Sequence, residues 1–151
     1  MGDVTYDLNR FVTAQQSDYQ TALSEIKSGR KRSHWMWYIF PQVKGLGKSS
    51  TSQYYGISSI QEAEAFLEHP ILGHNLIEIS EALLTLESNN ATEIFDKPDD
   101  KKLKSSMTLF SMADLNCPVF EKVLEKFFDG RRDGKTIHIL NTEVSTQMTQ
   151  F

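Results

Sequence analysis

Apolar residues recur every three or four positions over most of this chain. The clearest series is Leu72, Leu76, Ile79, Leu83 and Leu86. Because an α-helix has about 3.6 residues per turn, this spacing places all of these side chains on one helix face. No long segment alternates apolar and polar residues with the period of two that is typical of a half-buried strand. The pattern therefore predicts an all-α protein.

Turn-forming residues divide the periodic segments into about six helices joined by irregular loops. The expected starts are Leu8, Ser58 or Ser59, the residues after Pro70, the residues after Pro98, Asn116 to Pro118, and Lys135. Gly29 is expected to end the first helix, since glycine often stands just past a helix end. Thr92 is expected to cap a short turn. Residues 44–56 are rich in Gly, Ser and Lys and are typical of a loop.

A single compact domain accounts for this pattern. The chain has 151 residues, the length of one ordinary domain, and no linker is long enough to split it. We expect the helical domain to span residues 1–140. Residues 141–151 are polar and carry only one charged side chain, Glu143, so we expect a flexible C-terminal tail there.

Several features indicate a soluble, cytoplasmic protein with no cofactor and no metal site. Cys117 is the only cysteine, which excludes an internal disulfide and a cysteine-based zinc cluster. His69 and His74 are five positions apart, whereas a metal-binding pair on one helix face is about four apart. No apolar run reaches the roughly 18 residues that cross a bilayer, and the N-terminus lacks the pattern of a signal peptide. We therefore expect no membrane partner.

The most concentrated chemistry lies in residues 29–42, GRKRSHWMWYIFPQ. Three basic residues, Arg30 to Arg32, precede Ser33 and His34. Ser33 suits the N-cap of a helix, and the positive end of a helix attracts anions. The basic residues therefore have two interpretations. They surround an anion together with Ser33 and His34, or they form a solvated charge run.

The aromatic block that follows, Trp35 to Phe40, also has two interpretations. Its large rings would bury so much apolar area that a position in the core accounts for most of them. Alternatively, Trp35 or Trp37 lines a pocket and stacks on a planar ligand. The two interpretations differ in whether these indoles are enclosed by other apolar side chains.

Two further segments carry cations and hydroxyls that suit an anion. GLGKSS resembles a phosphate-binding P-loop, but the glycine that this motif needs at position 42 is replaced by Gln42. Lys48 is still a candidate for holding an anion from a flexible loop. In PDDKKLKSS, residues 98–106, Lys104 and Ser105 form a candidate anion cradle. The structural alternative for this segment is a well-capped surface helix.

Six segments together resemble a known family. They are DLNRF at 7–11, GRKRSHWMWYIFPQ at 29–42, GLGKS at 45–49, YYGI at 54–57, HPILG at 69–73 and DDKKLKSSMTLF at 99–110. In this order they resemble the bacterial and fungal family known as domain of unknown function 1810, over about residues 7–129. The resemblance implies a compact, mostly helical single domain with a fold type of its own, and it implies no established activity. The name calpastatin, which some relatives carry, does not suit a folded domain of this kind.

Three functions remain open at this point. The first is a domain, either a binding protein or an enzyme, that recognises an anionic or nucleotide-like small molecule at the segment from Arg30 to Gln42. The second is a protein-interaction module that uses the loop from Lys44 to Tyr55 and exposed aromatic side chains. The third is binding of single-stranded nucleic acid, against which the net charge of −4 counts.

For the first function, His34 is the candidate general acid or base, since imidazole titrates near neutral pH. The residues expected to bind the ligand are Arg32, Ser33, His34, Trp35, Trp37, Lys48, Lys104 and Ser105. No particular protein partner is indicated.

Overall fold

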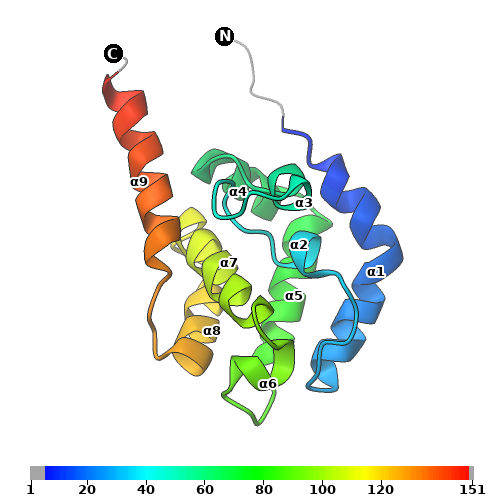
Figure 1. Cartoon of the computed structure of the whole chain (residues 1–151). Coiled ribbons are helices and arrows are strands. Elements are labelled where there is room, and N and C mark those ends of the chain that lie inside the picture. Colours follow the sequence, from blue (N-terminus) through cyan, green and yellow to red (C-terminus); the bar gives the residue numbers. More distant parts are fainter. Residues whose placement is uncertain (1–5, 150–151) are drawn as a thin grey trace.

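Helices joined by loops build the described part of the chain (Figure 1). The computed structural model describes residues 6–149, with side chains described through residue 142. The helices in this part are α1 (Asn9–Lys27), α2 (Met36–Ile39), α3 (Ser50–Tyr54), α4 (Ile60–Glu68), α5 (Leu72–Leu84), α6 (Ala91–Phe95), α7 (Asp99–Ala113), α8 (Val119–Phe128) and α9 (Gly134–Thr149). All of them except α3 contribute residues to one apolar core, which confirms the predicted all-α class and the single domain.

The number of helices differs from the prediction of about six. The long helices α1, α4, α5, α7, α8 and α9 correspond to the expected ones, and three helices of four or five residues are additional. A helix with fewer than two turns leaves no periodic pattern in the sequence. Helix α3 lies inside the expected loop and is capped by Ser49. Helix α6 is capped by Asn90 rather than by Thr92.

The last helix is longer than expected. Helix α9 runs from Gly134 to Thr149, whereas the sequence predicts only one or two turns at residues 135–140. Figure 1 shows its C-terminal half extending away from the other helices. Residues 150–151 lie outside the described part of the chain, and the flexibility expected for residues 141–151 stays a prediction.

Helix α5 lies at the centre of the bundle. It contacts α1, α4 and α8, while α7 contacts α4, α6, α8 and α9. The side chains of Leu72, Leu76, Ile79 and Leu83 are buried, as their spacing predicts. Leu86, the last member of the predicted series, lies past the end of α5 and is only partly buried. None of the helices described between residues 6 and 149 is long and apolar enough to cross a membrane.

The segment between α2 and α4 is fixed at both ends. The Lys44 N–H donates to the Ile57 carbonyl at 2.8 Å, and the Ile57 N–H donates to the Gln42 carbonyl at 2.9 Å. These two bonds form a parallel bridge at Val43 and Ile57. The bridge fixes the start of the following loop, whose Leu46 lines a cavity together with the first turns of α7 and the start of α9.

Candidate functional site

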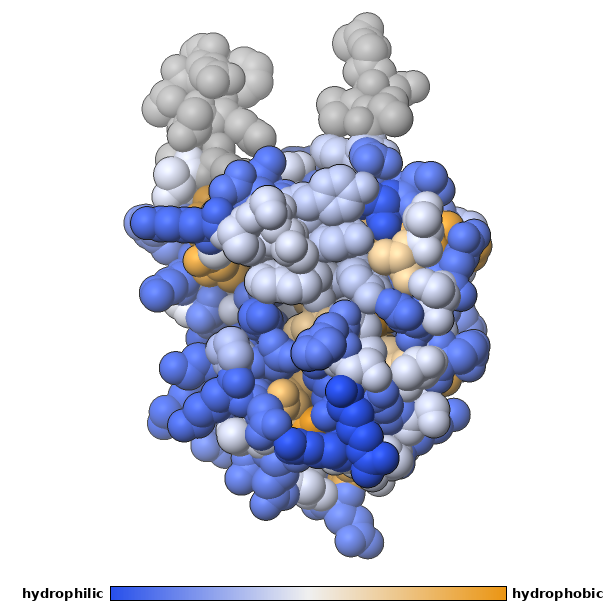
Figure 2. Space-filling model, turned by 45° about the vertical axis from the view of Figure 1, so that its right-hand side comes forward, coloured by the Kyte–Doolittle hydropathy of each residue, from blue (hydrophilic) through white to orange (hydrophobic). Residues whose placement is uncertain are grey.

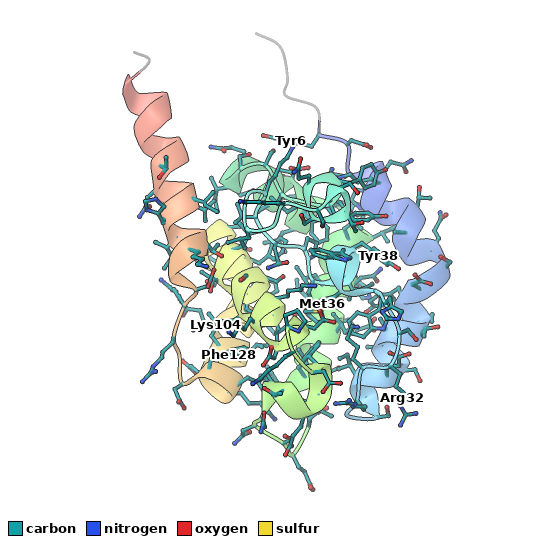
Figure 3. All side chains as sticks on the ribbon, in the orientation of Figure 1. Tyr6, Arg32, Met36, Tyr38, Lys104 and Phe128 are labelled. Carbon is teal, nitrogen blue, oxygen red and sulfur yellow. The ribbon has the colours of Figure 1, made fainter. Side chains whose placement is uncertain are left out.

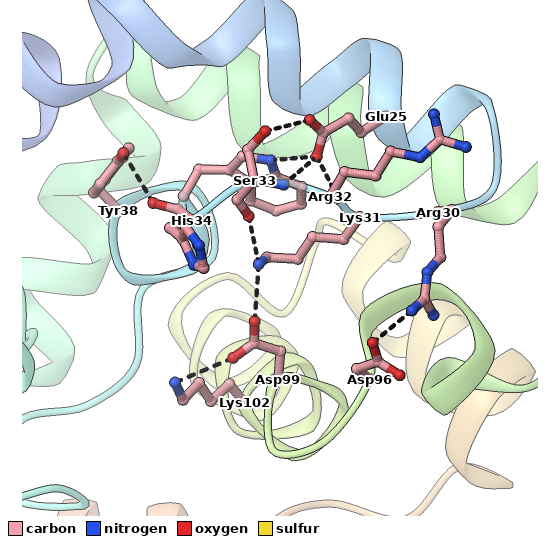
Figure 4. Close-up of polar contacts among 11 residues, drawn as sticks. Glu25, Arg30, Lys31, Arg32, Ser33, His34, Tyr38, Asp96, Asp99 and Lys102 are labelled. Carbon is pink, nitrogen blue, oxygen red and sulfur yellow. Dashed lines mark hydrogen bonds and ion pairs between the residues drawn. The ribbon is translucent and has the colours of Figure 1, made fainter.

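One carboxylate holds the basic segment against α1. Glu25 accepts four hydrogen bonds: from the Arg32 N–H at 2.7 Å, the Ser33 N–H at 2.9 Å, the Ser33 hydroxyl at 2.6 Å and the Trp35 indole N–H at 2.9 Å (Figure 4). Ser33, one of the residues that the sequence assigns to an external anion, thus binds an anion of the chain itself.

These hydrogen bonds lower the pKa of Glu25. Partial burial raises the pKa of the Glu25 carboxyl group, because burial disfavours the charged form. The hydrogen bonds from Ser33, Arg32 and Trp35 favour the charged form by more, and they lower the pKa from 4.5 to about 2. Glu25 is therefore ionised at neutral pH and satisfies these donors without a ligand.

Trp35 is part of the core. It is 1% exposed, and its ring lies 6.2 Å from that of Phe40 and 6.4 Å from that of Phe95, measured between centroids. Of its two interpretations, the structure supports the core position. Ser33 does not cap a helix, because α2 begins at Met36 and has Trp35 as its N-cap residue. The Ser33 hydroxyl binds Glu25 instead.

The remaining polar residues of this segment face outward or bind one another. Arg32 and His34 are exposed, and Figure 4 shows the Arg32 guanidinium directed away from Glu25. The His34 backbone carbonyl accepts from the Tyr38 hydroxyl at 3.3 Å. Lys48, on the loop before α3, is exposed as well. None of Arg32, His34 and Lys48 lines the cavity described below.

A row of charges and rings joins the basic segment to α7. The Lys31 ammonium lies 2.9 Å from the Asp99 carboxylate and 5.1 Å from the centre of the Trp35 ring. Asp99 also pairs with Lys102 at 3.1 Å, and the Lys102 ammonium lies 3.9 Å from the centre of the Trp37 ring. Trp37 is only partly buried. Asp99 and Trp37 together hold the Lys102 ammonium in one place.

A cavity of about 680 Å³ lies beside Lys102, between the loop after α2, the first turns of α7 and the start of α9. Its lining residues are Gln42, Leu46, Pro98, Lys101, Lys102, Lys104, Ser105, Asp133, Gly134 and Lys135. We call it the lysine cavity. Its volume falls in the range of about 300–1,000 Å³ that is usual for small-molecule sites.

The lysine cavity is locally cationic in an acidic chain. Four of its ten lining residues are lysines, whereas the net charge of the chain is −4. Among the described side chains, Lys102 pairs with Asp99, while Lys101, Lys104 and Lys135 have no carboxylate within 4.0 Å. No three His, Cys, Asp or Glu side chains in this part of the chain are grouped to hold a metal ion. The chemistry of the cavity thus suits an anion.

Hydrogen bonds fix the α9 side of the lysine cavity to α7. The Asp133 N–H donates to the Thr108 hydroxyl oxygen at 2.9 Å, and that hydroxyl donates to the Lys104 carbonyl at 2.8 Å. The Asp133 carboxylate accepts from the Thr136 N–H at 3.0 Å and from the Thr136 hydroxyl at 2.6 Å. The one acidic residue in the lining is therefore engaged in capping α9.

The structure brings two of the predicted ligand residues to the lysine cavity, Lys104 and Ser105. The segment 29–42 contributes Gln42 to the lining. Figure 3 shows Lys104 and Arg32 well apart, on different parts of the molecule.

Three lysines of the cavity were missed by the sequence analysis. Lys101 and Lys102 stand in the same charge run as Lys104, so the sequence of this run could have indicated all three as ligand-binding candidates. Lys135 carries no local signal, because it belongs to a different helix and reaches the cavity only through the packing of α9 on α7.

Among the described side chains, the exposed large apolar ones are Tyr54, Ile71 and Leu115. Figure 2 shows one face of the molecule, on which hydrophobic areas are small and separated by hydrophilic residues. Only Tyr54 belongs to the loop from Lys44 to Tyr55. One exposed ring is far smaller than the several hundred Å² of a typical interaction patch.

Comparisons with known proteins agree with the fold. The sequence matches the family described as "Protein of unknown function (DUF1810)" over residues 5–140. The structure is similar to the crystal structure of the conserved hypothetical protein Rv1873 from Mycobacterium tuberculosis, with a TM-score of 0.88 and 44% sequence identity over 90% of this chain and 97% of that chain. None of the curated proteins matches the sequence. The chain therefore belongs to the DUF1810 family, as its six characteristic segments predict.

Proposed function

We propose that the protein binds a small, multiply charged anion in the lysine cavity. The observation that supports this most is the convergence of Lys101, Lys104 and Lys135 on one cavity without an acidic partner among the described side chains. Phosphate and carboxylate groups form charge-assisted hydrogen bonds with ammonium groups. Such an anion would therefore find several donors at once.

The shape of the cavity supports the same ligand. A concave site with walls of low dielectric constant concentrates the electric field of the charges that line it. Gathering like charges is unfavourable, and Asp133 is the one carboxylate that lines the cavity beside its four lysines. A bound anion would relieve the repulsion among the ammonium groups. Gln42 adds an amide that is able to bind further ligand oxygens.

This proposal keeps the anionic ligand that the sequence predicts, but it assigns the anion to the lysine cavity instead of the segment from Arg30 to Gln42. The segment from Arg30 to Gln42 supports the site instead of forming it, through Trp37 under Lys102 and through Gln42 in the lining. We assign no catalytic residue, because His34 is exposed and does not line the lysine cavity.

Thermal unfolding in the presence of inorganic phosphate, pyrophosphate and citrate tests the proposal. A ligand present at about 100 times its dissociation constant adds about 2.7 kcal/mol to the free energy of unfolding. We expect pyrophosphate or citrate to raise the melting temperature, and we expect the double variant Lys104→Gln/Lys135→Gln to lose most of that rise. Added salt should weaken the effect, because it screens exposed charges.

The control variant is Lys122→Gln, an exposed lysine of α8 that does not line the cavity. It should respond to the anions as the unchanged protein does. An equal loss in both variants, or no response to any anion, would contradict the proposal. A single-stranded oligonucleotide in the same panel tests the nucleic-acid alternative, which predicts tighter binding than pyrophosphate and a steep dependence on salt.

A further inference from the structure

A second hollow of different character lies next to the lysine cavity. This hollow has a volume of about 400 Å³, and it shares Leu46, Gly134 and Lys135 with the lysine cavity. Its other lining residues are Gly45, His138 and Ile139. The two spaces therefore adjoin each other at the three shared residues. From here on, the lysine cavity is called the lysine arm and the second hollow is called the apolar arm.

The apolar arm offers different contacts from the lysine arm. Leu46 and Ile139 are both partly buried and pack against the core, so they present an apolar wall. His138 is the only ionisable residue in this lining besides the shared Lys135. Its imidazole is able to donate or accept a hydrogen bond. An uncharged organic group with one polar position suits this arm better than a second anion does.

Gly45 keeps the apolar arm open. Its backbone has φ = +107°, a conformation that residues other than glycine rarely adopt. A Cβ at this position would lie 3.6 Å from Ile139 Cδ1. A larger side chain would point into the space beside Ile139. The absence of a side chain at this position therefore leaves room between the loop and α9.

We propose that the ligand is a phosphate monoester, with its phosphate in the lysine arm and its organic part in the apolar arm. This inference rests on the proposed function, since it uses the same lysines to hold the charge. Lys135 lies at the junction of the two arms, where it reaches the ester end of the phosphate. The two adjoining hollows together offer more room than one phosphate ion fills.

Isothermal titration calorimetry compares inorganic phosphate, glycerol phosphate, phenyl phosphate and a nucleoside monophosphate. We expect each ester with a larger organic part to bind at least tenfold more tightly than inorganic phosphate. In the variants His138→Ala and Ile139→Gln, the affinity for the ester should fall at least fivefold, while the affinity for inorganic phosphate should stay within twofold. His138 is exposed and does not belong to the core, so its replacement should leave the fold intact even if Ile139→Gln lowers stability.

The outcomes separate the two proposals. If phosphate and the esters bind equally, the inference about the apolar arm is wrong and the anion site stands. If the esters bind more tightly but neither variant weakens them, the organic part lies elsewhere and the inference is again wrong. If neither phosphate nor any ester binds but pyrophosphate or citrate does, the inference about a phosphate monoester is wrong and the anion site stands. If no anion binds at all, the proposed function itself fails.

Discussion

At the scale of single residues, Glu25 organises the segment that follows α1. Its carboxylate accepts from two consecutive backbone N–H groups, one hydroxyl and one indole N–H. The indole belongs to Trp35, which is buried, so its N–H has no access to water as an alternative partner. A buried donor without a partner costs about 1–3 kcal/mol. One side chain thus holds both the turn at Arg32 and Ser33 and an indole of the core.

We predict that Glu25→Gln destabilises the protein by about 2–3 kcal/mol at pH 7, because a neutral amide is a weaker acceptor and turns an NH₂ toward the same donors. The pKa of Glu25 is lowered to about 2 in the folded protein. Its contribution is therefore complete above the unfolded-state pKa of 4.5 and is lost as the pH falls toward 2. Urea unfolding at pH 7, 4.5 and 3 measures this effect. The free energies of unfolding of Glu25→Gln and of the unchanged protein should differ less as the pH falls.

The matched control is Glu125→Gln, on the exposed face of α8, which should change the free energy of unfolding by no more than about 0.5 kcal/mol. A difference for Glu25→Gln that stays constant down to pH 3 would show that the charge of Glu25 is not what stabilises the turn.

At the scale of helices, α4 and α5 meet so closely that one position excludes a side chain. A Cβ built at Gly73 would lie 2.0 Å from the Leu67 carbonyl oxygen and 2.8 Å from the Leu67 carbonyl carbon. Both contacts are with backbone atoms, which cannot move without shifting a helix. The Gly73 N–H also donates to the His69 carbonyl at 2.9 Å. Glycine at this position therefore allows the tight connection between the two helices.

We predict that Gly73→Ala destabilises the protein by about 3 kcal/mol or more, because relieving the clash requires α4 and α5 to separate. Gly134→Ala is the control, since a Cβ there would meet nothing within 4 Å, and alanine favours a helix over glycine by up to about 1 kcal/mol. Guanidinium unfolding of both variants checks the difference. Equal stabilities would mean that the helices separate at little cost.

At the scale of the whole molecule, Arg10 ties together parts of the chain that are far apart in sequence. Its guanidinium donates to the Tyr54 carbonyl at 2.7 Å, to the Gly56 carbonyl at 3.0 Å and to the Glu62 carboxylate at 3.0 Å. The two charged side chains are only 9% and 4% exposed. The ion pair connects α1 with α4, and the other two hydrogen bonds of Arg10 connect α1 with the end of α3 and the loop after it.

We predict that Arg10→Met costs about 3–5 kcal/mol, because it leaves the Glu62 carboxylate buried without its cation. The double variant Arg10→Met/Glu62→Leu should recover part of this loss, since the unpaired charge is then gone. Chemical unfolding of the single and double variants measures the recovery.

The comparison for Arg10→Met is Arg132→Met, which removes an exposed ion pair between Arg132 and Glu121. Exposed pairs contribute about 0–1 kcal/mol. If both arginine variants lose the same small amount, burial of the Arg10 pair is not what makes it important.

Some features of the site were accessible from the chain alone. Lys104 and Ser105 stand in a segment whose charges and hydroxyls point to an anion, and both line the lysine cavity. Ser33 has the residue type of a helix cap, but its hydroxyl is taken by Glu25, eight positions earlier in the chain. A capping residue and a residue that binds a side chain elsewhere look the same in sequence.

The local amino-acid pattern specifies the long helices and the family, because helical periodicity and capping depend on residues within about four positions of one another. It does not specify which cations share a cavity. Lys135 and Lys104 line the same cavity because α9 packs on α7, where the Asp133 N–H donates to the Thr108 hydroxyl oxygen. Contacts between distant residues depend on how the buried faces of all helices pack together, and that packing turned the Arg32 side chain to the solvent and closed the core around Trp35.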